Sequence, residues 1–150
     1  MGKSQRSKGA AAEREVCKIL NDELGLDLKR NLTQYQQSDG DIEVGGWLLE
    51  VKRQENLSLR TWWDQAVRQA ENSELAPAVV YRQSRQPWKV IIPLAIISPM
   101  FDNHGLPDWC VEFEYTATVL LDPMFTTMLR ESLAMETLYM MQEKENQTLQ

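Results

Sequence analysis

The chain has 150 residues, a mass of 17.4 kDa and a formal net charge of −6 at neutral pH. This length fits one ordinary domain, and its 43% hydrophobic and 25% charged residues exclude a wholly disordered or collagen-like chain. Two cysteines and one histidine cannot supply a four-ligand zinc site, and a histidine nucleophile is disfavoured. No apolar run approaches the roughly 20 residues that span a bilayer. We therefore expect no membrane partner and a cytoplasmic location.

The first elements follow from periodicity. Residues 1–9 are polar and basic and are expected to be flexible. From about Ala10 to Leu24 the apolar residues fall on one helical stripe, and Gly25 is a suitable C-cap. Residues 29–35 are compatible with a strand, and the QQSDG that follows reads as a loop.

A hairpin and a helix come next. DIEV and WLLEVKR alternate in polarity around the two-residue turn Gly45-Gly46, which is a strong hairpin signal. Ser58 is a suitable N-cap for an amphipathic helix over residues 58–73. Trp62 and Trp63 lie on its apolar stripe, so we expect them in the core or in a dimer contact.

The remaining chain adds strands and a final helix. PAVVYRQ and WKVIIPL predict a strand pair, and WCVEFEY and TATVLL predict further strands. Residues 124–144 are rich in Met and Leu and predict a helix, followed by a polar tail. The order of elements predicts an α/β (α+β) fold in which helices flank a mixed central β-sheet.

The hairpin carries the residues that point to chemistry. With a tight turn at Gly45-Gly46, Asp41 lies opposite Glu50, and Lys52 stands beside Glu50 on the same face. Two opposed carboxylates repel each other, and a divalent cation between them removes that cost. Oxygen ligands suit Mg²⁺, which keeps part of its water shell and binds phosphate. Lys52 can orient the attacking water or offset charge on phosphorus, so the set suits phosphodiester hydrolysis.

An ordinary alternative stands beside this interpretation: the same side chains could be the solvated face of an amphipathic strand. The first helix offers a third acid, because Glu13 lies on the same side as Val16 and Leu20. A carboxylate on an apolar stripe is costly unless it has a partner, so Glu13 could approach the hairpin acids. Its alternative is a border position with the carboxylate in water.

Three segments together resemble the PD-(D/E)XK nuclease superfamily, and within it the archaeal-type and phage Holliday-junction resolvases. They are KGAAAERE from Lys8, the GDI of residues 40–42 and the LLEVK of residues 48–52, in the same order and at similar spacing as in those enzymes. The resemblance covers about residues 8–93 and implies a restriction-endonuclease-like core, divalent-metal catalysis, homodimers and cleavage of branched DNA. We expect a nuclease domain over residues 10–122, after the flexible residues 1–9. A C-terminal helical extension and polar tail over residues 123–150 would follow, in a region that has no counterpart in the compact resolvases.

The resemblance also implies a set of site residues. The catalytic set is Glu13, Asp41, Glu50 and Lys52. The metal, Mg²⁺ with Mn²⁺ as a substitute, would be held by Asp41, Glu50 and the Val51 backbone carbonyl, and by Glu13 directly or through water. Arg14 and the loop before Asp41, including Ser38, would contact DNA. A phage source would place the protein in the host cytoplasm.

Several polar residues keep two interpretations. The DNA-binding candidates Lys3, Arg6 and Lys8 could grip phosphates or belong to a solubilising tail, and Arg53 and Arg60 could rim a cleft or be ordinary surface charge. Gln65 and Gln69 could reach the active face or lie in solvent. The leading expectation is a resolvase-like endodeoxyribonuclease. A restriction-like, nicking or end-processing nuclease and a non-catalytic DNA-binding protein are the alternatives.

Overall fold

The computed structural model describes residues 3–30, 41–97 and 111–150. Its helices and strands, in chain order, are α1 (Lys3–Leu24), β1 (Ile42–Val44), β2 (Trp47–Arg53), α2 (Leu59–Ala70), β3 (Ala76–Arg82), β4 (Lys89–Pro93), β5 (Thr116–Leu120) and α3 (Thr126–Thr148). Short helical turns cover Leu94–Ile97, Phe113–Tyr115 and Leu121–Phe125. None of the helices that it describes is long and apolar enough to cross a membrane.

The five strands form one mixed sheet in the order β1-β2-β3-β4-β5. β2 and β3 are parallel, and the other neighbouring pairs are antiparallel. The parallel pair needs a crossover, which α2 provides. The predicted α+β architecture with a mixed sheet flanked by helices is therefore confirmed.

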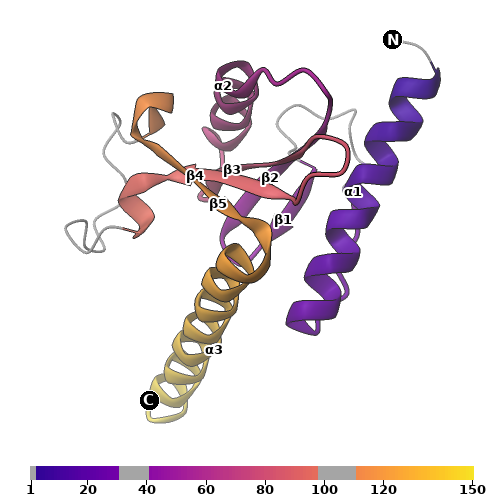
Figure 1. Ribbon diagram of the computed structural model, residues 1–150. Coiled ribbons are helices and arrows are strands. Elements are labelled where there is room, and N and C mark those ends of the chain that lie inside the picture. Colours follow the sequence, from indigo (N-terminus) through magenta and orange to yellow (C-terminus); the bar gives the residue numbers. More distant parts are fainter. Residues whose placement is uncertain (1–2, 31–40, 98–110) are drawn as a thin grey trace.

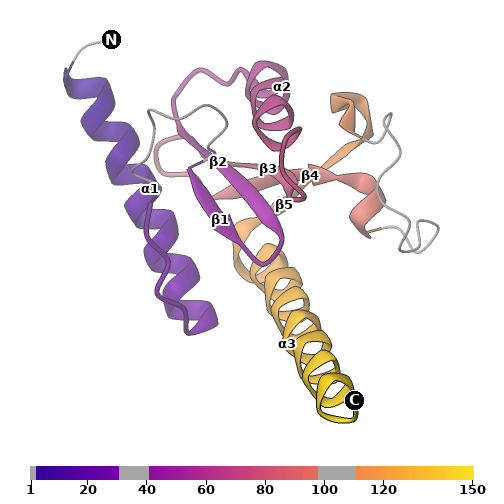
Figure 2. The same ribbon diagram turned by 180° about the vertical axis from the view of Figure 1, so that it is seen from behind.

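Helices cover both faces of this sheet (Figures 1 and 2). One face packs against α1 and the start of α3, through a large apolar cluster that includes Val16, Leu20, Leu49 and Phe125. The other face packs against α2, where Trp62 and Trp63 are buried beside Tyr81, as their apolar stripe predicted. The sheet that contains the β1–β2 hairpin thus lies between two packed layers.

The first helix begins earlier than predicted. Residues 3–9, which we expected to be flexible, form the opening turns of α1 instead of preceding a helix near Ala10. No proline interrupts this stretch, and its Lys, Gln and Arg residues are good helix formers, so the helix propagates outward from its packed part. The end of α1 agrees with the prediction, because Gly25 has a φ of +66° and its N–H donates to the Asn21 carbonyl at 2.9 Å.

Two of the predicted strands do not form in the part of the chain that the structure describes. Phe113–Tyr115 forms a 3₁₀ turn rather than a strand, and Phe113 packs against the α2 cluster. Alternation over so short a run does not separate a strand from a turn that buries one side chain. Lys29 and Arg30 have no regular secondary structure. The rest of the predicted strand 29–35 and the QQSDG loop lie outside the described residues.

Candidate active site

The hairpin of β1 and β2 brings the two predicted metal ligands together. Its register is the one that the Gly45-Gly46 turn predicted, and both glycines have positive φ angles, as such a turn requires. The paired register ends at Ile42 and Leu49, and the Asp41 N–H donates to the Leu49 carbonyl at 2.9 Å, so Asp41 and Ile42 both lie against Leu49 at this end of the hairpin. The Val51 N–H donates to Asp41 Oδ2 at 2.6 Å. The backbone of β2 therefore holds the Asp41 carboxylate in place.

Glu50 is fixed by two donors, one from the same face of β2 and one from α2. Lys52 Nζ lies 2.7 Å from Glu50 Oε1, and Gln65 Nε2 of α2 donates to the same oxygen at 2.9 Å. Gln65 Oε1 in turn accepts from Lys52 Nζ at 3.3 Å. Glu50 is buried, with 4% of its surface exposed, and its second oxygen, Oε2, has no hydrogen-bond partner. A buried carboxylate oxygen without a partner is costly unless a ligand satisfies it.

The electrostatics of Asp41 lead to the same conclusion. Burial raises the pKa of the Asp41 carboxyl to about 7, and the negative charge of Glu50 adds to the rise. The Val51 N–H and the Lys52 ammonium oppose it, but less strongly. Two carboxyl groups are thus held close together in a poorly solvated place, where a bound cation would offset their mutual repulsion.

Glu13 reaches this region from α1, as its place on the apolar stripe suggested. It is 6% exposed, and its Oε2 accepts from Arg30 Nε at 2.8 Å. Burial raises the pKa of Glu13, Arg30 opposes the rise, and the charge of Glu50 adds to it. Glu13 therefore has a partner already, in an ion pair whose side chains are 8% and 24% exposed.

This donor set fits a hard divalent cation. Asp41 and Glu50 offer carboxylate oxygens, one of which is buried and unpartnered, and oxygen ligands of this kind suit Mg²⁺ or Mn²⁺. Within the described ranges no three His, Cys, Asp or Glu side chains converge closely enough to hold a metal ion. The fit therefore favours two carboxylates with backbone and water oxygens, and it leaves Glu13 an indirect role through water.

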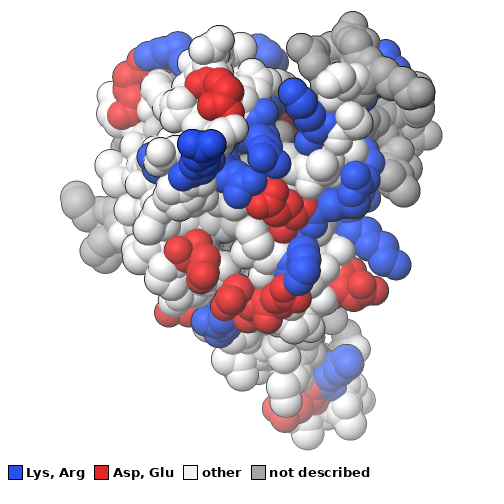
Figure 3. Space-filling view, turned by 45° about the vertical axis from the view of Figure 1, so that its right-hand side comes forward, with Lys and Arg blue, Asp and Glu red and all other residues white. Residues whose placement is uncertain are grey.

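The predicted DNA-binding residues have different surroundings. Arg6, Lys8 and Arg14 are exposed along α1. Arg53 is exposed near the end of β2, 3.7 Å from Glu15, whereas Arg60 pairs with Glu114 and lies over the Phe113 ring. Ser38 and the Lys3 side chain lie outside the described residues. On the face drawn in Figure 3, lysine and arginine side chains form a broken band over the upper half, above a more acidic lower part.

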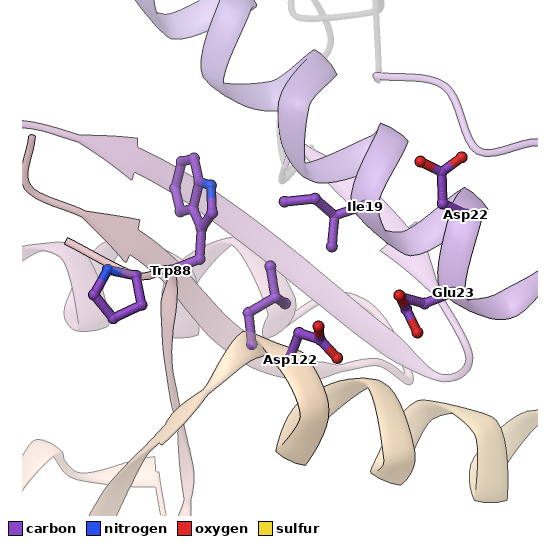
Figure 4. A pocket seen from close by; sticks show the side chains of 7 residues that line it. Ile19, Asp22, Glu23, Trp88 and Asp122 are labelled. Carbon is purple, nitrogen blue, oxygen red and sulfur yellow. The ribbon is translucent and has the colours of Figure 1, made fainter. Parts of the chain in front are cut away.

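A separate hollow lies between α1, β4 and the start of α3. It has a volume of about 280 Å³ and an apolar lining that includes Trp88 and Leu121, and Asp22, Glu23 and Asp122 bring carboxylates to it (Figure 4). Three like charges repel phosphates rather than attract them. The hollow contains none of the hairpin acids and is not the site of the predicted chemistry.

Sequence reasoning did not identify the roles of Gln65 and Arg30, which both contact the site. Gln65 is half-buried and hydrogen-bonded to Glu50, whereas the sequence left open that its side chain lies in solvent. Arg30 was placed only in a possible strand, and its pairing with Glu13 depends on chain segments 17 residues apart. Helical spacing gave a weak signal for Gln65, whereas no sequence signal pointed to Arg30.

A mixed sheet has helices on both faces, and a hairpin brings an Asp close to a Glu-x-Lys triplet. These features define a restriction-endonuclease-like nuclease domain. The chain belongs to the family described as "Phage putative PDDEXK endonuclease", whose model matches residues 4–136. It is also 28% identical over 127 residues to Protein D14 of Escherichia phage T5, an alignment that covers 69% of this chain and 78% of that protein. The predicted superfamily, its phage association and the nuclease class are confirmed.

Proposed function

We propose that this chain is a divalent-metal-dependent endodeoxyribonuclease that cuts branched DNA, Holliday junctions in particular. The observation that carries the proposal is the asymmetry of Glu50, which has one oxygen fixed by two donors and one that is buried and unpartnered. Asp41 lies close enough for the charge of Glu50 to add to the rise that burial gives its pKa. Two poorly solvated carboxylates so close together lower the stability of a folded protein unless a cation binds between them.

In this proposal Asp41 and Glu50 hold Mg²⁺, for which Mn²⁺ substitutes, with the Val51 carbonyl as a further ligand. The cation supplies positive charge beside the scissile phosphate and favours formation of a nucleophile at neutral pH. The β2 backbone and Gln65 keep the carboxylates in position, so little reorganisation is needed when the ion and the substrate arrive.

Lys52 and Glu13 complete the proposed catalytic set. The Lys52 ammonium stands beside Glu50 with 19% of its side chain exposed, so it can approach a water molecule or a phosphate oxygen. There it would orient the attacking water or offset the negative charge that develops on the phosphate. Glu13, paired with Arg30, would bind the ion's water shell rather than the ion.

DNA would lie along α1 and the end of β2, where Arg6, Lys8, Arg14 and Arg53 are exposed. Each phosphate contact would add to a salt-dependent affinity. Arg60 is exposed too, but it pairs with Glu114. A twofold homodimer would present two identical sites to a four-way junction and could cut two strands symmetrically. The resemblance to the resolvases is what favours branched DNA over linear DNA.

A panel of four-way junction, flap, nicked and linear DNA in Mg²⁺ tests the proposal. Wild type is expected to cut the junction fastest, and Asp41→Asn is expected to lose at least about 100-fold in rate while it still binds the junction in EDTA. Glu43→Gln is the matched control, because Glu43 is an exposed carboxylate on the same hairpin. Wild-type cleavage by Asp41→Asn would refute the metal site.

The same panel separates the alternatives. Equal cutting of all four substrates would favour a restriction-like, nicking or end-processing nuclease of the same fold. Calorimetry with Mg²⁺ or Mn²⁺ distinguishes a non-catalytic DNA-binding protein, which would bind DNA without binding either ion. Each outcome leaves the fold unchanged and alters only the substrate or the chemistry.

A further inference from the structure

The Gln65 amide connects the two charged residues of β2. Its Nε2 donates to Glu50 Oε1 at 2.9 Å, and its Oε1 accepts from Lys52 Nζ at 3.3 Å. Gln65 lies in the middle of α2, which packs against β2 and β3 through its apolar stripe. A rigid helix thus places one amide against both ends of the Glu50–Lys52 pair.

This contact determines which oxygen of Glu50 is left for a ligand. The terminal torsion of a glutamate is broad and roughly twofold, so a carboxylate held by one donor can exchange its two oxygens. In this chain Oε1 is held by both Lys52 and Gln65, and Oε2 is buried without a partner. The second donor therefore keeps the same oxygen in the ligand position.

The contact also restricts the Lys52 ammonium. An ammonium group has three N–H donors, and two of them point to Glu50 Oε1 and Gln65 Oε1. The direction of the third is then fixed by tetrahedral geometry. A lysine without the second acceptor would sample several rotamers around Glu50.

We infer that Gln65 is a positioning residue of the site, which orients the Glu50 carboxylate toward a divalent cation and the Lys52 ammonium toward the substrate. This inference rests on the proposed function, because it assigns a task to the same carboxylate. Removal of a residue that orients a metal ligand typically costs 10–100-fold in metal affinity or activity. We expect losses in that range.

Gln69 provides a matched control. It lies one helical turn beyond Gln65 on α2 and is also half-buried, but its Oε1 has no hydrogen-bond partner. Gln65→Met and Gln69→Met remove the same amide from the same helix at similar burial. Only Gln65→Met removes the two contacts with β2.

The experiment measures Mn²⁺ affinity by calorimetry without DNA, and junction cleavage in Mg²⁺. Gln65→Met is expected to bind Mn²⁺ about 10-fold more weakly and to lower kcat about 10–100-fold, with KM changed less than about 2-fold. Gln69→Met should match wild type in both assays. Because Gln65 acts through its partners, its effect on kcat should be much smaller in a Lys52→Met background.

The outcomes separate the two claims. Wild-type Mn²⁺ affinity and kcat in Gln65→Met, alongside an active wild type, would overturn this inference and leave the proposed function intact. Equal losses in Gln65→Met and Gln69→Met would also overturn it, because they would indicate a general effect on α2. A wild-type protein that neither binds Mn²⁺ nor cuts DNA would overturn the proposed function and this inference with it.

Discussion

Arg30 and Glu13 form an ion pair whose energetics can be tested. Glu13 is almost fully buried, and Arg30 Nε is the only donor within 3.5 Å that the described residues give it. Arg30→Met would leave a buried carboxylate without its partner, and we expect it to lower the free energy of unfolding by about 3 kcal/mol. The double variant Glu13→Gln/Arg30→Met should recover most of that loss. Urea unfolding of wild type, Arg30→Met, Glu13→Gln and the double variant measures the coupling energy between the two side chains.

Equal stability of Arg30→Met and wild type would contradict this account of the pair. Lys29→Met is the control, because Lys29 is the preceding residue and is exposed, with its Nζ 3.9 Å from Asp27. A weak pair between exposed side chains contributes little, so we expect a change below about 0.5 kcal/mol there.

At the scale of elements, Glu15 links α1 to the sheet, two residues after Glu13. The two terminal guanidinium nitrogens of Arg82, on β3, lie 2.8 and 3.1 Å from the carboxylate oxygens of Glu15. The Trp88 indole N–H also donates to Glu15, at 3.2 Å. Arg82 also lies over the Trp88 ring, 4.7 Å from its centre. This bidentate contact fixes the rotation of α1 and thereby the position of Glu13.

We therefore expect Glu15→Ala to lower both stability and cleavage. It leaves the mostly buried Arg82 without its acceptor, which costs about 1–3 kcal/mol, and it allows α1 to shift by a distance sufficient to slow catalysis about 10-fold. Urea unfolding and junction cleavage measure the two effects. Glu23→Ala is the control, since Glu23 is exposed on the same helix and Arg130 donates to its backbone carbonyl, which the substitution keeps. A Glu15→Ala protein with wild-type values in both assays would show that Glu15 does not position α1.

The hairpin and α2 were the elements most open to prediction from sequence. A two-residue Gly45-Gly46 turn permits one register, so the pairing of Ile42 with Leu49 and of Val44 with Trp47 followed from local rules. The bond from the Asp41 N–H to the same Leu49 carbonyl departs from the regular ladder, and simple alternation did not predict it. The amphipathic stripe of α2 likewise predicted which side packs. These elements carry their own geometric constraints within a few residues.

The remaining features depend on contacts between distant segments. Whether Glu13 faces water or Arg30 is decided by how residues 25–30 return along α1, and nothing within the helix specifies it. Gln65 reaches Glu50 only because α2 crosses β2 at a particular angle. The start of α1 and the turn at Phe113–Tyr115 were missed because short polar or alternating runs fit more than one conformation.

At the scale of the whole molecule, α3 extends away from the sheet (Figure 2). Its first turns pack through Phe125 and Leu129, and Leu133 approaches the Gly45 backbone. The 12 residues after Glu136 continue for about 18 Å. Helices of that length are marginal on their own in water and are usually stabilised by packing. Among the described residues, the distal part of α3 therefore has no apolar surface to pack against.

A second copy of this chain is the occupant that we expect there. Five large apolar side chains of α3 are each more than half exposed: Met135, Leu138, Tyr139, Met140 and Met141. Met135, Leu138, Tyr139 and Met141 share one side of the helix and offer on the order of 400 Å² per copy. Pairing two copies through this side would bring together about 800 Å² of apolar surface, and flanking polar side chains would add to the interface. We expect wild type to sediment as a dimer and Leu138→Glu with Met141→Glu as a folded monomer, because Phe125 and Leu129 still pack. A monomeric wild type, or a double variant that stays dimeric, would contradict assembly through α3.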